Sequence, residues 1–510
     1  MKAKAPFIHV RLVAGQPQMD GIPHYQVGRR DAHGTRPGFA AWRWDGAALT
    51  VENCRYGIRP LYYYVGRDEI CVSTSIEVLL ARGAPVELDV EALALFLRLS
   101  WFAAEDTPFK AIRLVPPAAR FRWDGALTLE SGLHLVPTSG LSRAAAQDEY
   151  IARFRRAIER DYVDGGLLPL SGGRDSRHIL FELCRIGRPR LCVTVKDAPP
   201  WPNPNENTLL ARQLTAMFGI EHAVLDYIPD LVAAERAKNV LTNLCSIEHS
   251  WYMPVHDRLA REHGRVFDGL AGDYLSAGGG LDPEMVRMLD AGRIDELAHY
   301  FLVRRQAPGV EFLRDQKQFP FEAARARIKR EFERHLGAVN PIGSYFFWNR
   351  VRRGIGSSSF GIMAAHDVCA PFLDYDVFDL LTSLPLSTYA DRKFHTEAIN
   401  RTFPQYAHIP FEGKKKTPAS NPRGYLLRNR LRLLGHLLLR GRGVLDLPHI
   451  APRLLAHALY GQGHSAWYDS ASIYMIQLGE TIAGCQLSTR VGGAASARAG
   501  ALASAGCSSL

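Results

Sequence analysis

The segment Leu168–Leu180 reads LPLSGGRDSRHIL and decides the fold, because it joins a strand, a glycine-rich turn and the start of a helix. Its apolar beginning predicts a buried strand, and the helical pattern after the turn ends near Gly187. Such a turn exposes backbone N–H groups at a helix N-terminus, an arrangement that binds anions. Two adjacent glycines also let a phosphate approach the backbone without meeting a Cβ atom. The segment therefore predicts a phosphate-binding loop.

The polar side chains of this loop refine the prediction. Ser171 and Ser176 can donate hydroxyl hydrogen bonds, and Asp175 stands where a simple nucleoside-triphosphate loop would carry a lysine. A carboxylate beside a polyphosphate is repulsive unless a cation lies between them, so Asp175 indicates Mg²⁺. A tight turn with a helix-capping aspartate would explain a bare Ser-Gly-Gly equally well. The SGGxDS pattern after an apolar strand is more specific than such a turn.

The sequence around the loop alternates between strand and helix patterns. Residues 147–162 place apolar side chains on one helical face, and residues 205–218 form a second helical pattern closed by Gly219. The runs LCVTV, HAVLDY and RVFDGL read as strands. This alternation predicts a doubly wound parallel sheet with helices on both faces, in which ligands bind beyond the carboxyl ends of the strands. The phosphate-binding loop is expected at that edge.

Before residue 140 the pattern is different. Short runs such as PFIHVRLV, PLYYYVG and EICVSTS, separated by Gly, Asp and Pro, predict a β-rich domain over residues 1–140. Helices are expected at Ile76–Ala81 and near Asp89–Trp101. The sequence RFRWDGALTLE predicts a hairpin with its turn at Asp124-Gly125.

The bulk composition limits the classes of partner. A length of 510 residues favours two domains, and we expect the second over residues 141–486 and a disordered tail over residues 487–510. The net charge of +10 comes from scattered basic residues, without the aromatic-interleaved basic stripe of RNA-binding proteins. Dense basic clusters occur at Lys414–Lys416 and Arg428–Arg442. Nucleic acid is therefore not expected as a partner.

Cysteine usage and hydropathy indicate the compartment. The eight cysteines include no CxxC pair, which argues against a zinc site or a thioredoxin-like motif. The N-terminus lacks the apolar core of a signal peptide, and no apolar run is long enough to span a bilayer. We therefore expect a cytoplasmic protein with reduced thiols and no membrane partner.

Four stretches together carry a family resemblance. SGGRDS resembles the pyrophosphate-binding motif of the ATP-pyrophosphatase families, and its surroundings resemble asparagine synthetase. VFDGLAGDYLSAGG, from Val266, and MAAHDVCAPFLDYDVFDLLTSLP, from Met363, resemble later motifs of that family. CRYGIRPLYYY and STSIEVLLA resemble its glutaminase domain. The resemblance covers most of residues 40–420.

The resemblance implies a fold and a reaction. The first domain would be a β-sandwich related to the N-terminal-nucleophile hydrolases, and the second a doubly wound ATP-pyrophosphatase domain with a helical extension. A carboxylate would attack the α-phosphate of ATP, and an amine would then displace AMP from the acyl group. The resemblance places pyrophosphate and ATP against a set of loop and strand residues, namely Ser171, Gly172, Gly173, Asp175, Ser176, Val195, Gly269 and Gly272. Asp175 and Asp273 would hold Mg²⁺.

A lysine of the family's C-terminal motif stabilises charge on the transferring phosphate. GKKKTP offers Lys414, Lys415 and Lys416 for this role, and Lys415 is preferred. Because the family spacing is not kept here, Lys414 stays an alternative, and a solvated basic loop would explain any one of these lysines equally well.

The chain departs from the family in its glutaminase motif. Glutamine-hydrolysing members carry an N-terminal cysteine after removal of Met, whereas position 2 here is Lys2. The first cysteine is Cys54, which lies in a predicted strand and cannot use its own α-amine as a base. We therefore expect that glutamine hydrolysis is lost and that the first domain is a structural remnant.

Two further departures concern the amine. Leu270 stands where asparagine synthetase has a glutamate and β-lactam synthetase a tyrosine that helps to deprotonate the amine. Asp367 and Cys369 replace a glutamate and an arginine before Pro-Phe-Leu-Asp. Asp367 is a candidate base or orienting carboxylate, although a surface or helix-capping role would explain it as well.

These departures favour an amine other than free ammonia. The preferred interpretation is an AMP-forming amide ligase resembling lasso-peptide macrolactam synthetases, with a peptide as substrate and a protease or leader-binding protein as possible partner. The alternatives are asparagine synthetase using ammonia or a partner glutaminase, a β-lactam synthetase-like cyclisation of a small amino acid, and a non-catalytic nucleotide-binding scaffold. A tRNA-thiolating enzyme would need reactive cysteines and an RNA-binding domain, and neither is evident.

Overall fold

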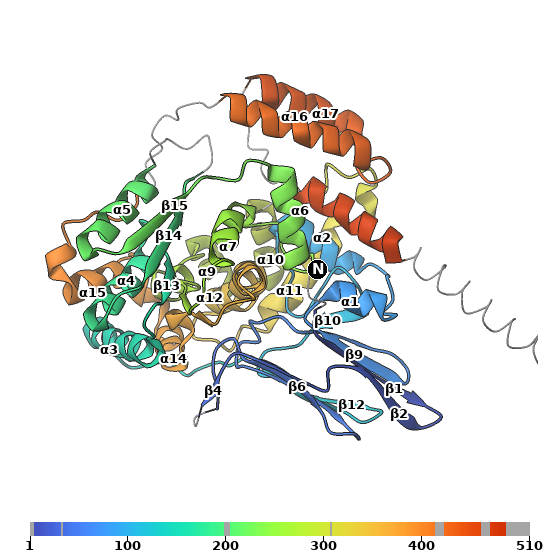
Figure 1. Cartoon of the computed structure of the whole chain (residues 1–510), viewed down its shortest axis with the longest axis horizontal. Coiled ribbons are helices and arrows are strands. Elements are labelled where there is room, and N and C mark those ends of the chain that lie inside the picture. Colours follow the sequence, from blue (N-terminus) through green and yellow to red (C-terminus); the bar gives the residue numbers. More distant parts are fainter. Residues whose placement is uncertain are drawn as a thin grey trace, which may run out of the picture.

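A computed structural model of the chain describes residues 5–31, 34–197, 205–305, 309–413, 423–460 and 470–485. A sheet-rich part comes first, and a part with helices and a parallel sheet follows it (Figure 1). This mixed α/β architecture confirms the expected fold class at that level. The predicted tail over residues 487–510 lies outside the described residues.

Two five-stranded antiparallel sheets form the first part. The strands of one sheet are, in spatial order, β10 (Ile112–Leu114), β8 (Tyr62–Val65), β9 (Glu69–Ser73), β1 (Phe7–Val13) and β2 (Gln16–Gly21). Those of the other are β12 (Leu127–Glu130), β11 (Arg120–Trp123), β7 (Leu49–Asn53), β6 (Ala40–Trp44) and β3 (His24–Val27). Alternate side chains of both sheets, such as Val10, Val51 and Phe121, share one buried cluster. The two sheets therefore pack face to face as a sandwich. A short ribbon pairs β4 (Arg30–Asp31) with β5 (Gly34–Thr35).

The local elements predicted in the first part are confirmed. Helices α1 (Ile76–Ala81) and α2 (Val90–Leu99) are present, and β11 pairs with β12 across the Asp124-Gly125 turn. Gly125 adopts φ +107°, which explains why glycine is needed there. α2 is buried over Ala92–Leu99, as its nearly all-apolar sequence requires.

Five parallel strands form the second sheet system. Their spatial order is β15 (Glu221–Leu225), β14 (Leu191–Val195), β13 (Leu167–Pro169), β16 (Val266–Phe267) and β17 (Val368–Cys369). The chain runs outward from β13 to β15 and then returns to the other side of β13 with β16. Strand order therefore reverses between β13 and β16, and in open α/β sheets this switch point is where ligands bind.

Helices surround and extend this sheet. The α-helices are α3 (Arg143–Asp161), α4 (Arg174–Ile186), α5 (Glu206–Phe218), α6 (Leu231–Leu241), α7 (Met253–Leu259), α8 (Gly272–Ser276), α9 (Pro283–Asp290), α10 (Ile294–Arg305), α11 (Phe321–Glu333), α12 (Pro341–Tyr345), α13 (Gly356–Ile362), α14 (Tyr375–Ser383), α15 (Phe394–Thr402), α16 (Arg423–Arg440) and α17 (Leu447–Tyr460). Residues 470–485 are also helical. The short 3-10 helices are η1 (Ser250–Tyr252), η2 (Gln316–Gln318), η4 (Pro371–Leu373), η5 (Leu386–Thr388) and η6 (Pro404–Tyr406). The segment η3 (Phe346–Ile355) is a π-helix. Within the described ranges, no helix is both long and apolar enough to cross a membrane.

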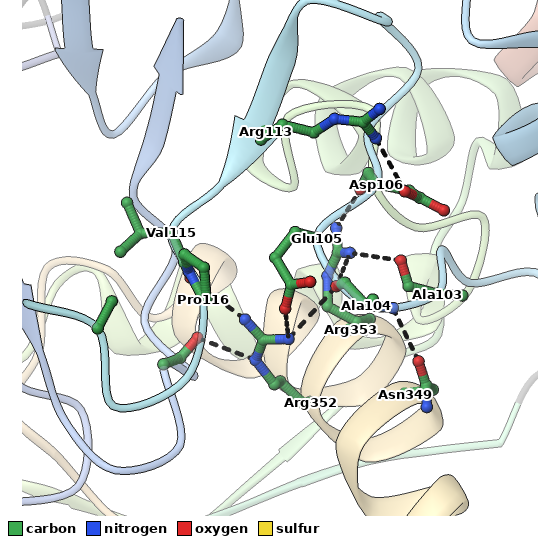
Figure 2. Close-up of polar contacts among 12 residues, drawn as sticks. Ala103, Ala104, Glu105, Asp106, Arg113, Val115, Pro116, Asn349, Arg352 and Arg353 are labelled. Carbon is green, nitrogen blue, oxygen red and sulfur yellow. Dashed lines mark hydrogen bonds and ion pairs between the residues drawn. The ribbon is translucent and has the colours of Figure 1, made fainter. Parts of the chain in front are cut away.

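The two parts are joined through buried arginines of η3. Arg352 donates to the carbonyls of Gly57 at 3.3 Å and Val115 at 3.2 Å, and Arg353 donates to that of Asp106 at 2.7 Å (Figure 2). Burial lowers the pKa of Arg352 to about 10. We refer to this set of contacts between η3 and the first part as the junction. Two apolar clusters also contain residues from both sides of residue 140, so the parts share core as well as polar contacts.

Candidate active site

The turn between β13 and α4 is closed by its own side chains. Ser171 N–H donates to the Ser176 hydroxyl at 3.0 Å, and Gly173 N–H donates to the Ser171 hydroxyl at 3.2 Å. Gly172 N–H donates to the side-chain oxygen of Asn207 at 2.7 Å. These three backbone N–H groups, which the sequence predicts to bind an anion, already donate hydrogen bonds to side-chain oxygens of the protein. A phosphate that bound to them would have to replace those oxygens.

The loop after β16 packs directly against Asp175. A Cβ atom at Gly272 would lie 2.4 Å from the Asp175 Cγ, and one at Gly269 would lie 3.0 Å from its Cβ. Between them, Ala271 adopts φ +75°, a left-handed conformation that residues with a side chain rarely use. The two glycines therefore allow the close approach of two loops that are far apart in the sequence.

A large pocket opens at this edge of the sheet. It has a volume of about 1270 Å³ and is lined by residues of both loops, including Ser171, Gly173, Asp175, Ser176, Gly269, Gly272 and Asp273. Val193 and Val195 of β14 contribute an apolar wall. The pocket lies at the carboxyl ends of the strands, where the sheet order predicts a ligand. The structure therefore brings most of the sequence-predicted residues to one place.

Asp175 contacts a buried network of histidine and tyrosine side chains. Its Oδ1 atom is 3.3 Å from His395 Nδ1, and that nitrogen is 3.0 Å from the Ser276 hydroxyl. His395 Nε2 is 3.1 Å from His178 Nδ1, which also lies 3.1 Å from the Tyr150 hydroxyl. Burial lowers the pKa of His178 well below its usual value, so this ring is neutral. Through His395, this network contacts the Asp175 carboxylate from the protein interior. The sequence contains no motif that links His395 to Asp175.

Asp268 is a second carboxylate that the sequence analysis did not single out. It follows β16 directly, lines the same pocket, and accepts the Leu270 N–H through its Oδ1 at 2.8 Å. Burial, together with the negative charge of Asp175, raises the pKa of Asp268 to about 6. The signal was present in the sequence, because an aspartate at the carboxyl end of a parallel strand lies at the ligand edge.

Asp367 is not brought together with the other predicted site residues. It precedes β17, whose residues pair in parallel with β16, so Asp367 lies at the amino ends of the strands. Its carboxylate pairs with Arg265 at 2.7 Å and Arg29 at 3.7 Å. Cys369 is buried and its thiol donates to Asp161 at 3.2 Å. Asp367 is therefore a surface ion-pair partner on the edge opposite the pocket.

The segment leading to the three lysines passes the pocket. Buried Arg177 donates to the carbonyls of Gly172 at 3.0 Å and Pro410 at 2.8 Å, and Glu412 N–H donates to the Gly172 carbonyl at 3.0 Å. Gly413 also lines the pocket. Lys414, Lys415 and Lys416 follow it in sequence but lie outside the described residues. Gly172 therefore accepts hydrogen bonds from Arg177 and Glu412, and it is not one of the residues that line the pocket.

The residues of the pocket are chemically suited to Mg²⁺ bound together with phosphates. The Asp175 Oδ1 atom is buried and has no hydrogen-bond partner, and Asp273 is 68% exposed, 3.7 Å from Arg174. Among the described residues, no three His, Cys, Asp or Glu side chains converge as a metal site of their own. Mg²⁺ typically takes one or two carboxylates and completes its shell with water and substrate phosphates. The carboxylates of Asp175 and Asp273 fit that role.

Comparison with known families identifies part of the chain. A sequence profile described as the glutamine amidotransferase domain matches residues 30–131. The first part of the protein therefore contains an amidotransferase-type domain, in agreement with the resemblance to the asparagine synthetase N-terminal domain. No curated protein matches the chain.

The described cysteines of the matched range are not accessible nucleophiles. Cys54 and Cys71 are both fully buried. Burial raises the pKa of the Cys71 thiol to about 12, so it stays protonated at neutral pH. Neither side chain has the exposed thiolate that glutamine hydrolysis by a cysteine requires.

Proposed function

We propose that the protein is an ATP-dependent, AMP-forming amide ligase that activates a peptide carboxylate and joins it to an amine. The observation that carries this proposal is the convergence of Asp175, Asp273 and the Ser171–Gly173 turn in one pocket at the switch point of a parallel sheet. A pocket for a small neutral ligand would not need two carboxylates beside a helix N-terminus.

Different parts of the pocket are expected to bind different parts of ATP. The N-terminus of α4 favours negative charge, so the pyrophosphate part of ATP is expected at the Ser171–Gly173 turn. Asp175 and Asp273 would hold Mg²⁺, which offsets charge on the departing pyrophosphate. Val193 and Val195 offer an apolar surface for the adenine ring. The substrate carboxylate then attacks the α-phosphorus, pyrophosphate leaves, and attack by the amine on the acyl carbon releases AMP.

The pocket, which must hold ATP as well as the carboxylate substrate, is larger than is usual for one small molecule. Its volume of about 1270 Å³ exceeds the range of roughly 300–1,000 Å³ that is usual for small-molecule sites. Aspartate would need a small closed pocket with cations around its α-carboxylate. We therefore propose closure of a macrolactam of the lasso-peptide type, in which an Asp or Glu side chain is joined to the peptide's own amino terminus.

The test is AMP release from ATP and Mg²⁺ by the purified protein. The carboxylate panel contains aspartate with an ammonium salt, and peptides with a free amino terminus and an internal Asp or Glu. Peptide-dependent AMP that disappears in Asp175→Ala, with a cyclised product lighter by one water, would support the proposal. Asp226→Ala serves as a matched control, because Asp226 is 82% exposed and pairs with Lys196 outside the pocket.

Other outcomes would replace this function by another. Aspartate-dependent AMP together with asparagine would make the protein an asparagine synthetase that uses ammonia. ATP binding without AMP release for any carboxylate would favour a nucleotide-binding scaffold.

A further inference from the structure

The amine step needs a proton acceptor, and the position where the related synthetases provide one is apolar here. An amine that is protonated at neutral pH cannot attack an acyl group until it loses a proton. Leu270 is buried and has no group that could accept it. The acceptor must therefore come from another side chain that reaches the same pocket.

Asp268 has the position for this task. It lies two residues before Leu270, at the carboxyl end of β16, and its N–H donates to the Cys369 carbonyl at 2.8 Å. The Leu270 N–H holds Oδ1 at 2.8 Å. Within the described residues, Oδ2 has no hydrogen-bond partner, and the side chain lines the pocket. One carboxylate oxygen is thus anchored by the backbone while the other is available to a ligand.

Other titratable groups of the pocket suit the task less well. Burial lowers the pKa of His249 to about 3, which makes it a weak base. The Tyr252 hydroxyl contacts Met363 Sδ at 3.8 Å, and burial raises its pKa well above the usual value. Glu412 lies against the Ser171–Gly173 turn, where its N–H donates to the Gly172 carbonyl, and burial together with the negative charges of Asp197 and Glu206 raises its pKa. Asp268 lies on the side of β16, next to the loop that carries Asp273.

We propose that Asp268 is the general base of the amide-forming step. The free oxygen of Asp268 takes one proton from the ammonium group, the freed electron pair of the nitrogen forms the bond to the acyl carbon, and the nitrogen then gives its second proton to the phosphate of the departing AMP. The bond between that carbon and the phosphate oxygen breaks, and AMP leaves with the electron pair. This assignment rests on the proposed ligase function and names the residue that replaces the missing base at position 270.

The experiment compares two nucleophiles. The carboxylate is the Asp- or Glu-containing peptide of the panel above, with its amino terminus free for cyclisation or acetylated for trapping. Hydroxylamine is neutral at pH 7 and traps the activated carboxylate of the acetylated peptide without a base, whereas the protonated amino terminus of the free peptide must first lose a proton. For Asp268→Asn, we expect cyclisation of the free peptide to fall by about 10²-fold or more, and hydroxamate formation to change by less than about threefold. Asp268→Glu should recover part of the amide formation.

The outcomes separate the two proposals. Equal loss with both nucleophiles in a folded Asp268→Asn protein would overturn the assignment, since it would place Asp268 in ATP or metal binding. Loss confined to cyclisation in Glu412→Gln instead would overturn it in favour of that residue. Unchanged amide formation in Asp268→Asn would overturn the assignment alone. An inactive wild type with every carboxylate would overturn the ligase function, and the assignment with it. A thermal unfolding curve establishes that each variant is folded.

Discussion

The junction and the pocket both contain buried charged side chains, but these side chains differ in whether their charged ends form hydrogen bonds with the protein. At the junction, the terminal nitrogens of Arg352 and Arg353 find carbonyl oxygens of the first part at hydrogen-bond distance (Figure 2). In the pocket, Asp175 has a buried oxygen without a hydrogen bond, and Asp268 has one oxygen without a partner among the described residues. Buried polar groups are normally satisfied, so those that are not call for a functional explanation.

Variants at the junction should therefore mainly affect folding, and variants in the pocket should mainly affect chemistry. Removing a donor from a buried hydrogen-bond network leaves its acceptors unpaired and costs stability. Removing a carboxylate whose buried oxygen forms no hydrogen bond, and only lies near a histidine ring, costs less stability, but it removes what a ligand would bind.

The largest effect is expected for Asp175→Asn. AMP formation should fall by roughly 10³-fold, equivalent to about 4 kcal/mol, because the variant loses a Mg²⁺-binding charge beside the departing pyrophosphate. The free energy of unfolding should stay within about 1 kcal/mol of wild type, because the amide keeps the size of the side chain and the contact that changes, with His395 at 3.3 Å, is not a hydrogen bond. Denaturant titration and AMP release measure the two quantities. A strongly destabilised variant with normal activity per folded molecule would contradict the comparison.

At the junction, Arg353→Met should have the opposite profile. We expect the free energy of unfolding to fall by about 3 kcal/mol, since the carbonyls of Ala104 and Asp106 lose a buried donor. ATP affinity per folded molecule should stay unchanged. Arg287→Met is the matched control, because Arg287 is 71% exposed and its ion pair with Glu284 contributes little. Equal stability of both variants would show that the junction is not a stabilising contact.

A subtler effect is expected for Gly272→Ala. The new Cβ atom would lie 2.4 Å from the Asp175 Cγ, so the two loops must separate. We expect stability to fall by about 1–3 kcal/mol, as overpacking does elsewhere, and ATP affinity in the presence of Mg²⁺ to fall as well. Gly435→Ala in α16 is the control, because nothing lies within 4 Å of its new methyl group, and it should be neutral or stabilising. Unchanged ATP affinity in Gly272→Ala would mean that the loop spacing does not matter for binding.

The smallest effect concerns the amidotransferase-type domain. Added glutamine should not raise amide formation above the level with ammonium, and iodoacetamide should leave Cys54 and Cys71 unlabelled in the native protein at pH 7. Both thiols are buried, and the pKa of Cys71 is raised to about 12. Mass spectrometry of native and urea-unfolded samples measures the labelling. Glutamine-dependent glutamate release would contradict this prediction.

Local sequence signals were enough to locate many of the helices and turns and the part of the pocket around Ser171–Gly173. Glycine, proline and capping residues are local signals, so the hairpin at Asp124-Gly125, the helix closed by Gly219 and the turn at Ser171–Gly173 could be located in advance. The parallel sheet followed from the alternation of patterns, because a parallel pair needs a crossover helix. The position of Asp273 near Asp175 followed from the same topology.

The residues that reach the pocket and the junction from distant parts of the chain could be found only in the folded protein. His395 reaches Asp175 from α15, and Arg352 and Arg353 reach the first part from η3, and neither contact has a signature in local sequence. For Asp367 the opposite is true. Its sequence motif predicts a place in the active site, but the direction of β17 places it at the edge of the sheet opposite the pocket. The physical reason is the same in each case. Local sequence sets strands and turns, whereas the end of a strand at which a side chain lies, and what it meets there, depends on packing between segments hundreds of residues apart.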